Sequence, residues 1–545
     1  MKTKIKTFGR KVNYGVQIVA VGALTGALAG LIVTLYNMLV EFAEHFSVGC
    51  YNVLRMYPAF IPLLFVALFL GAIIVGGFCK FIPLIRGSGF PQTEGATQGL
   101  IHFKWYKVLT GMFAASLMVV FMGLSAGAEG PSLMIGGACG YGVSDVTRRN
   151  ASIRRYQITG GASAGLAVVL NAPLTGMVFA YEEAHKRFTP EVFVCSFSSV
   201  LTAITVRDLL VAAMGMEVGP FLEGFTFTAN AGIPFLLYAL GAALVVSLVA
   251  VGYYFLLFFA RKKFRKLNFW KGLGKYTIPF LLAGVCGLVT GYVMGGGVEF
   301  IEALSSASEH TVSVFGAPLI VSLLIIIALK FITTLVNIGC ELPCCGSLPM
   351  MAMGAGIGAA MSLLFQMWGM DPALSDGLII ICMVTFFTTV VKAPLTGILM
   401  TIELTWNFTY LLPAVVAVAV GYIIGDAFRT EPMHERILEE IIEEQRAPLK
   451  RLTVLVRVTA AAGRNIRDIL WPFSALVTNV SRGEARIIPE GDANLHAGDI
   501  LTVEGAPNDR EDYLGTLTAI VGEILEVREE SAEEEVEIAP EAKAS

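Results

Sequence analysis

The sequence predicts an all-α polytopic membrane protein, built from two inverted-topology repeats with broken helices and followed by a small cytoplasmic α+β domain. The composition, 55% hydrophobic and 15% charged over 545 residues, excludes an ordinary soluble globular protein. From residue 87 onwards Gly and Pro interrupt the apolar segments, which is tolerated at membrane depth only where the backbone is buried or lines a cavity. These interruptions recur in a second half, and the chain becomes polar after Arg429.

The chain begins with a basic segment, residues 1–12, followed by an apolar run from Asn13 to about His45. That run is too long for a signal peptide, so we expect a retained membrane helix. A second apolar segment extends from Pro58 to about Ile82. Because Lys and Arg concentrate in cytoplasmic loops, we expect both termini and both basic clusters to be cytoplasmic. The clusters are Lys2, Lys4, Lys6, Arg10 and Lys11, then Arg261, Lys262, Lys263, Arg265, Lys266 and Lys271.

An internal duplication divides the membrane part. The segment Asn171–Gly176 recurs, except for its first residue, as Lys392–Gly397, and the match continues to Glu182 and Glu403. The two repeats therefore cover about residues 13–215 and 228–428, joined by a polar loop. Gly/Pro-interrupted segments at matching places in two halves indicate a transporter with a midplane binding site. Upstream positions match with equal spacing: Pro131, Gly136 and Gly140 against Pro349, Gly354 and Gly358.

Three interruptions combine a glycine with a proline at the first turn of an expected helix: Gly87–Pro91, Gly127–Pro131 and Gly346–Pro349. Proline suits that turn because its missing N–H is no loss there. A helix N-terminus carries unpaired N–H groups and a partial positive charge, so three converging ends would bind an anion without a lysine or arginine. The alternative is three ordinary kinks packed by small residues.

Glu129 is an isolated carboxylate at the start of one of these helices, within an otherwise uncharged run. It can occupy the place of the anion when ionised and leave when protonated, so we expect it to act as gate and proton carrier. The alternative is a carboxylate that only complements the helix dipole.

The repeat distinguishes the neighbouring residues Glu182 and Glu183. Glu182 matches Glu403, so we expect this pair to be structural and to bond helix ends. Glu183 matches Leu404, and a carboxylate present in one half only suggests a proton relay towards the cytoplasm. The alternative for Glu183 is an interfacial carboxylate beside the basic stretch that follows it.

After Arg429 we expect a charged helix at 431–446, an α+β domain at 447–528 and a disordered acidic tail at 529–545. The expected strands are Leu452–Val458, Ala475–Val480, Ala485–Ile488 and Ile500–Glu504, with helices near Ile466–Leu470 and Arg510–Val521.

Nine cysteines lie mostly in apolar segments and are expected to be reduced. Cys340, Cys344 and Cys345 are too closely spaced for a convincing metal site, so we expect no metal and no cofactor. A membrane enzyme using Glu129, Cys344, Cys345 and His434 has little support, because no nucleophile and base share a recognisable motif. Nothing indicates nucleic-acid binding.

These motifs resemble those of the CLC family of chloride channels and chloride/proton exchangers, over roughly Asn13 to Ile437. Gly87–Pro91 is similar to the GSGxP motif, which implies that Ser88, with Gly87 and Gly89, contributes to the central anion site. Gly127–Pro131 is similar to GREGP, which implies that Glu129, beside Gly130, is the gating glutamate. Glu183 lies where exchangers of the family carry the internal proton glutamate. The resemblance implies a homodimer with a pore in each subunit.

Three positions depart from the family. Ala128 replaces the arginine of GREGP. Cys345–Pro349 stands where GxFxP is usual, so Ser347 replaces a phenylalanine, and the amides of Gly346, Ser347 and Leu348 are expected to face the anion. His434 aligns with the central-site tyrosine, although a surface histidine at the start of a cytoplasmic helix is the alternative.

The soluble domain resembles a TrkA-C (RCK C-terminal) module through Ile488–Asp492, Leu495, Gly498–Asp499, Leu501 and Val503. Such modules occur on ion-transport systems as dimerising, ligand-sensing units, so a small-molecule ligand of unknown identity is expected. The leading hypothesis is exchange of chloride, or a similar small anion, for protons across a cell membrane. The alternative is a passive, voltage- or ligand-regulated chloride channel of the same fold.

Overall fold

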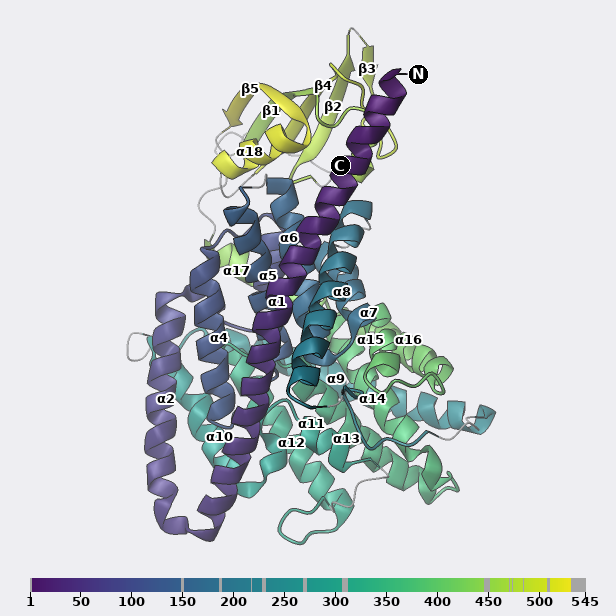
Figure 1. The fold of residues 1–545 in the computed structure, drawn as a ribbon. Coiled ribbons are helices and arrows are strands. Elements are labelled where there is room, and N and C mark those ends of the chain that lie inside the picture. The colour runs from purple at the N-terminus through teal and green to yellow at the C-terminus, as the bar shows by residue number, and fades with distance from the viewer. Residues whose placement is uncertain are drawn as a thin grey trace, which may run out of the picture.

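A computed structural model describes residues 2–530, except 149–150, 186–188, 217, 228–231, 268–271, 306–311, 446–450, 470, 473, 484 and 507–509. A small β-sheet module sits at one end of a large helical body, and the N-terminal end of α1 lies at the same end (Figure 1). We call this end the module side. Apart from Glu529 and Glu530, the expected acidic tail lies outside the described residues.

The first half of the body contains eight α-helices among the described residues. The first expected apolar segment continues past His45, so that α1 ends only at Met56. The elements are α1 (Lys2–Met56), α2 (Ile61–Phe81), α3 (Phe90–Gln98), α4 (Trp105–Phe121), α5 (Glu129–Val146), α6 (Ala151–Leu170), α7 (Pro173–Phe179) and α8 (Pro190–Ala213).

The second half repeats this order, and α17 (Met433–Gln445) follows it at the position of the expected charged helix. Seven helices in the described part of the chain are long and apolar enough to cross a membrane, by length and composition. The elements are α9 (Ile233–Phe264), α10 (Thr277–Val289), α11 (Val298–Ala303), α12 (Leu319–Gly339), α13 (Ser347–Gln366), α14 (Ser375–Val391), α15 (Pro394–Glu403) and α16 (Leu411–Ala427).

The duplicated glycines pack equivalent helix pairs in the two halves. In the first half, Gly136 and Gly140 lie so close to the backbone of α6 that a Cβ on either would overlap with it. In the second half, Gly354 and Gly358 lie against α14 in the same way. The glycine spacing shared by the two sequences therefore lets α5 approach α6, and α13 approach α14, at backbone distance.

The module is a five-stranded antiparallel sheet of order β3-β2-β4-β1-β5 with α18 packed on it. The strands expected from the sequence are present, whereas the helix expected near Ile466 is a single short 3-10 turn. The elements are β1 (Arg451–Val458), β2 (Leu476–Arg482), β3 (Ala485–Ile487), β4 (Ile500–Gly505), α18 (Arg510–Ile520) and β5 (Gly522–Glu530).

The last strand was not expected, and it corrects one boundary. β5 pairs with β1 along its length and includes Glu529 and Glu530, which the sequence analysis placed in the disordered tail. Its charged residues obscured it, because a strand at the edge of a sheet can carry exposed charges that prevent pairing with other chains.

One turn of the module is held by an ion pair. Asp499 accepts hydrogen bonds from Arg482 Nε at 2.9 Å, Arg482 Nη2 at 2.8 Å and the backbone N–H of His496 at 2.8 Å. The guanidinium of Arg482 holds the pKa of Asp499 below its usual range. The Gly498–Asp499 motif that marks the module in the sequence therefore closes the turn before β4.

The module contacts the body through α6 and α8. Arg155 of α6 donates to the carbonyls of Thr97 at 2.7 Å and Gln98 at 2.8 Å, at the end of α3, and to the carbonyl of Trp471 at 3.5 Å in the module. Arg464 of the module pairs with Glu191 of α8 at 3.0 Å.

Candidate anion and proton site

The three predicted interruptions each begin a helix, and these helices meet at one place. Gly127 before α5 and Cys345 before α13 form an antiparallel bridge, with N–H to O distances of 2.8 and 3.1 Å. The start of α3 approaches from the other side, because a Cβ on Gly130 would overlap with the carbonyl of Ser88. The starts of the three helices therefore lie close together, and backbone N–H groups at the start of a helix suit an anion.

Glu129 fills part of this volume. Its side chain is 2% exposed, and its Oε1 accepts a hydrogen bond from the backbone N–H of Leu348 at 2.5 Å. Its Oε2 has no hydrogen-bond partner among the described residues. The carboxylate of the first half thus occupies a helix N-terminus of the second half, a position that favours a negative charge.

The second predicted amide is turned elsewhere. The N–H of Ser347 donates to Cys345 Sγ at 3.4 Å, and that thiol donates to Ser347 Oγ at 3.2 Å. Cys345 was not predicted as part of the site. Its position two residues before Ser347 was the available signal, since a side chain can bond the backbone two residues on at such a turn.

Gly87, Ser88 and Gly346 line one cavity of about 200 Å³, the vestibule, whose far wall is Met433 and neighbouring residues of α17. Ser88 Oγ is buried and has no hydrogen-bond partner in the described part of the chain. Gly89 does not line the cavity; it is the N-cap of α3, in the left-handed conformation with a φ of 90°. The structure thus brings the predicted serine to an enclosed space with its hydroxyl available.

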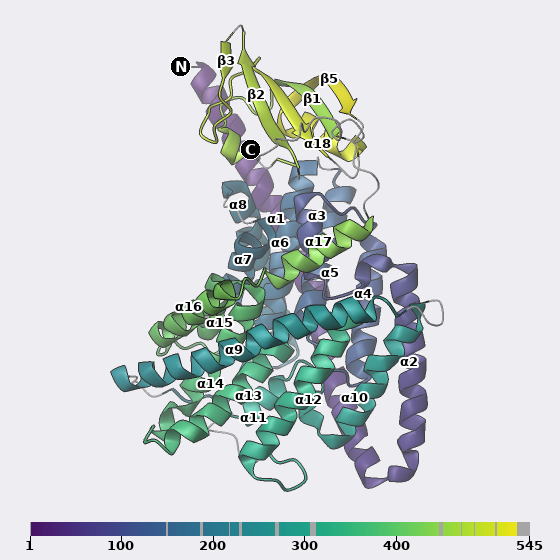
Figure 2. The same cartoon turned by 180° about the vertical axis from the view of Figure 1, so that it is seen from behind.

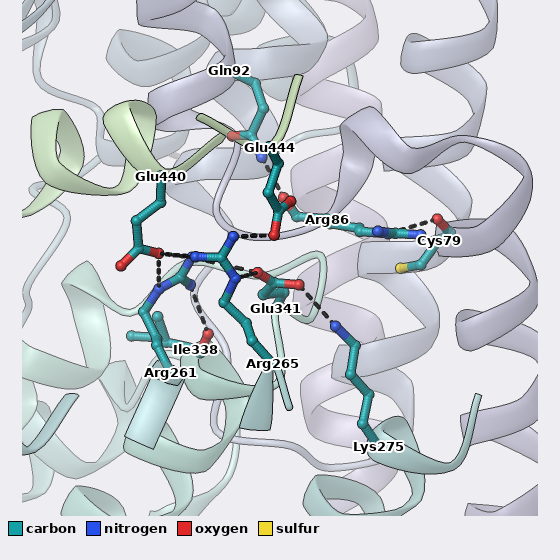
Figure 3. Close-up of polar contacts among 10 residues, drawn as sticks. All are labelled: Cys79, Arg86, Gln92, Arg261, Arg265, Lys275, Ile338, Glu341, Glu440 and Glu444. Carbon is teal, nitrogen blue, oxygen red and sulfur yellow. Dashed lines mark hydrogen bonds and ion pairs between the residues drawn. The ribbon is translucent and has the colours of Figure 1, made fainter. Parts of the chain in front are cut away.

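Charged side chains surround the vestibule (Figure 3). Arg261 and Arg265 at the end of α9 bond Glu440 of α17 at 3.0 and 3.1 Å, and Arg265 also bonds Glu444. Glu341 pairs with Lys275 at 2.8 Å. The pairs of Arg261 and Arg265 with Glu440 and Glu444 fasten α17 to the end of α9. Arg86, which also lines the cavity, was not predicted, although its place directly before Gly87 was a signal.

His434 lies apart from the vestibule. It is 1% exposed, which rules out the surface alternative, and its ring stacks on Phe90 with centroids 4.5 Å apart. Its Nδ1 lies 3.3 Å from Glu183 Oε2. The two side chains line a second cavity of about 10 Å³, room for one water molecule. His434 therefore lies beside Glu183, while the neighbouring Met433 lines the vestibule.

Glu182 and Glu403 form a reciprocal pair across the halves. Glu182 accepts from the N–H groups of Leu395 and Thr396 at 2.8 and 2.7 Å, at the start of α15. Glu403 accepts from those of Leu174 and Thr175 at 2.7 and 2.6 Å, at the start of α7. The prediction of a structural pair is confirmed, with the refinement that each carboxylate caps a helix of the opposite half.

A fourth interruption escaped the sequence analysis. Gly295–Gly297 precedes α11 as Gly87–Gly89 precedes α3, and Gly297 and Gly89 share a φ of 90°. Gly295 N–H donates to Leu124 O at 3.0 Å, the counterpart of Gly87 N–H donating to Glu341 O at 3.1 Å. No proline marks this loop, so the proline-based search passed over it.

The space beside this fourth loop is filled by a lysine. Lys330 of α12 is fully buried and donates to the carbonyls of Val293, Met294 and Gly295 at 3.3 to 3.4 Å. Glu44 of α1 accepts from the N–H of Gly296 at 2.9 Å. The second half thus holds an ammonium group where the first half leaves the vestibule.

Comparison with known proteins supplies the context for this geometry. The family model described as "Voltage gated chloride channel" matches residues 70–426, and that of the TrkA-C domain matches residues 453–515. The H(+)/Cl(-) exchange transporter ClcA of Vibrio cholerae serotype O1 (strain M66-2) is 27% identical over 455 residues, 82% of this chain and 94% of the relative. ClcA of Salmonella arizonae is 27% identical over 440 residues, 79% and 90% of the two chains.

Solved structures share the fold. A slow cyanobacterial Cl−/H+ antiporter superposes with a TM-score of 0.71 at 22% identity, covering 78% of this chain and 98% of its own. A CLC-type fluoride/proton antiporter gives 0.61 at 17% identity, covering 76% and 96%. The predicted fold class, a helical multi-span body with a small α+β domain, is confirmed. The chain is a multi-pass membrane protein of the CLC family, a family of transporters rather than enzymes, with a C-terminal TrkA-C domain.

Proposed function

We propose that this protein exchanges chloride, or a similar small anion, for protons, with Glu129 as gate and external proton carrier and Glu183 as the internal proton glutamate. We further propose that the module side and both termini are cytoplasmic, and that the protein is a homodimer. The exchange relatives support the transport assignment, and the basic clusters support the orientation. The homodimer is what the resemblance to the CLC family implies.

The carrying observation is the contact between Glu129 Oε1 and the Leu348 N–H. An ionised carboxylate and a transported anion would compete for this helix end. Protonation removes the charge that holds the side chain there, so an anion can take its place beside Ser88. One residue then couples the two fluxes, because anion entry requires a proton on Glu129.

The two cavities support separate routes on the module side. The anion would leave through the vestibule lined by Ser88, Gly87 and Gly346. The proton would leave through the pair Glu183 and His434, whose cavity has room for a single water molecule and is lined by neither Ser88 nor Gly346. His434 Nδ1 contacts Glu183, and its Nε2 has no hydrogen-bond partner among the described residues. The imidazole could therefore accept a proton at one nitrogen and release one from the other.

The test is a reversal-potential measurement in reconstituted vesicles. A chloride gradient should drive proton movement against a proton gradient, and Glu129→Gln should abolish that movement while anion flux persists. Anion current without coupled proton flux under any gradient would instead support the passive channel. That alternative is favoured only by the unusual Ser347 and His434 positions.

A further inference from the structure

A second hollow of about 200 Å³ adjoins the vestibule at Arg86 and has no role in the proposed exchange. Its basic residues come from separate parts of the fold: Lys80 ends α2, Arg86 precedes Gly87, Arg265 follows α9 and Lys275 precedes α10. Two glycines, two leucines and a tyrosine complete the lining. The lining residues, which we call the basic hollow, are Gly76, Lys80, Arg86, Arg265, Leu267, Gly272, Leu273, Lys275 and Tyr276.

Among the described residues, no acidic side chain lines the basic hollow. The carboxylates that partner its cations approach from the vestibule side: Glu341 bonds Lys275, and Glu444 bonds Arg265 (Figure 3). Neither Lys80 nor Arg86 has an ion-pair partner among the described residues. With Arg261 and Glu440 included, the cluster keeps an excess of two positive charges.

The donors suit an oxyanion with several acceptor atoms. Ammonium groups offer three N–H donors each, and guanidinium groups offer a planar fork that matches phosphate geometry. Four such groups around one hollow can satisfy all the oxygens of a phosphate, whereas a chloride ion could contact only part of the set. The exposed Phe81 beside Lys80, 86% exposed, places a lipid-facing surface next to the opening.

We propose that the basic hollow binds a phosphate group, supplied by an anionic lipid headgroup or by a soluble phosphate compound. The bound phosphate competes with Glu341 and Glu444 for Lys275 and Arg265. Since Arg265 ties α17 to α9, occupancy loosens the wall of the vestibule. α17 runs along the body below the module in Figure 2 and is the last helix before β1, so the site is placed to regulate anion entry.

The test uses the full chain and two probes. Native mass spectrometry measures phosphatidylglycerol retained by protein from mixed phosphatidylcholine vesicles, and calorimetric titration in detergent measures binding of glycerol 3-phosphate. Retention of the lipid alone identifies the headgroup source, and saturable binding of the soluble compound identifies the other.

Lys80→Gln should weaken binding of whichever probe binds by about fivefold, the effect expected for one basic charge near a membrane surface. Lys262→Gln is the matched control, because Lys262 is an exposed lysine near the end of α9 that does not line the hollow. It should leave probe binding unchanged. Lys80 has no ion pair among the described residues, so its loss should leave the fold intact.

Competition is tested on α17. Glu444→Gln removes one of the carboxylates that pair with Arg265 and should strengthen binding, whereas Glu443→Gln, at its exposed neighbour, should not. The proposal is overturned if neither probe binds, if Lys80→Gln and Lys262→Gln weaken binding equally, or if Glu444→Gln has no effect. None of these outcomes depends on whether the transport is coupled to protons.

Discussion

The two halves of the body use the same loop in opposite ways. In the first half, Gly87–Gly89 borders an open vestibule, and the hydroxyl of Ser88 has no partner among the described residues. In the second half, the counterpart Gly295–Gly297 is filled by the ammonium of Lys330. A backbone that is duplicated almost unchanged can therefore hold a site on one side and a plug on the other.

The helices behind these loops differ in a complementary way. In the first half the loop carries a side chain, Ser88, and the helix has none at Gly130. In the second half the helix carries Leu348, whose Cδ1 would lie 3.1 Å from a Cβ on Gly296, and the loop has none. What the halves share, namely the glycines and the Glu182 and Glu403 caps, is scaffold. What they do not share, Glu129 and Glu183, carries the proposed coupling.

The largest expected difference lies between Glu129 and its counterpart Ser347. Glu129→Ala should lower coupled proton flux by about a hundredfold or more, because a positioned proton-transfer group contributes about 10² to 10⁴ in rate. Ser347→Ala keeps the Leu348 N–H in place and should retain coupling. The measurement is proton uptake driven by a chloride gradient in vesicles. Equal losses in both variants would mean that the halves are not specialised in this way.

The second difference lies between Glu183 and Leu404. Glu183→Gln should remove proton coupling to a similar extent and leave anion flux, because the amide keeps the contact with His434 but carries no titratable proton. Leu404→Met, a change of similar volume at a fully buried position, should leave coupling unchanged. Chloride and proton fluxes recorded on the same vesicles check this. Normal coupling in Glu183→Gln would assign Glu183 to the scaffold.

The complementary packing predicts unequal tolerance of a methyl group. Gly130→Ala places a Cβ on the backbone carbonyl of Ser88, which cannot move freely, and should cost about 3 kcal/mol. Gly296→Ala meets the Leu348 side chain rather than backbone, with Cδ1 at 3.1 Å and Cβ at 3.3 Å, and should cost about 1 kcal/mol. Thermal unfolding in detergent measures both. Comparable costs would show that the loops are equally crowded.

The smallest difference between the halves is expected at the shared caps. Glu403→Gln and Glu182→Gln each weaken charge-assisted bonds to backbone N–H groups, worth about 1.5 to 3 kcal/mol in total. Glu403 is the more buried, 9% exposed, so its change should cost more. Both variants should keep full coupling in vesicles while losing thermal stability. A coupling defect in either would move the caps from scaffold to mechanism.

The sequence was sufficient for the parts marked by composition and by proline. The duplicated Pro131 and Pro349 predicted the starts of two broken helices. The lone charge of Glu129 marked the carboxylate that bonds the start of α13, and its role as a gate stays a prediction. Gly295–Gly297 was missed because it has no proline. β5 was missed because its charged residues suit a solvated tail as well as an edge strand. Pairings across the fold, such as Glu183 with His434 or Lys330 with three carbonyls, depend on tertiary contacts that spacing alone does not encode.

Arg155 joins the module to the C-terminal end of α3. Its single guanidinium bonds both the Trp471 carbonyl and the last carbonyls of α3. α3 has 9 residues, about 14 Å at the rise of an α-helix, and its other end carries Phe90 against His434. A single helix of two and a half turns, α3, therefore connects the contact with the module to the His434 ring beside Glu183.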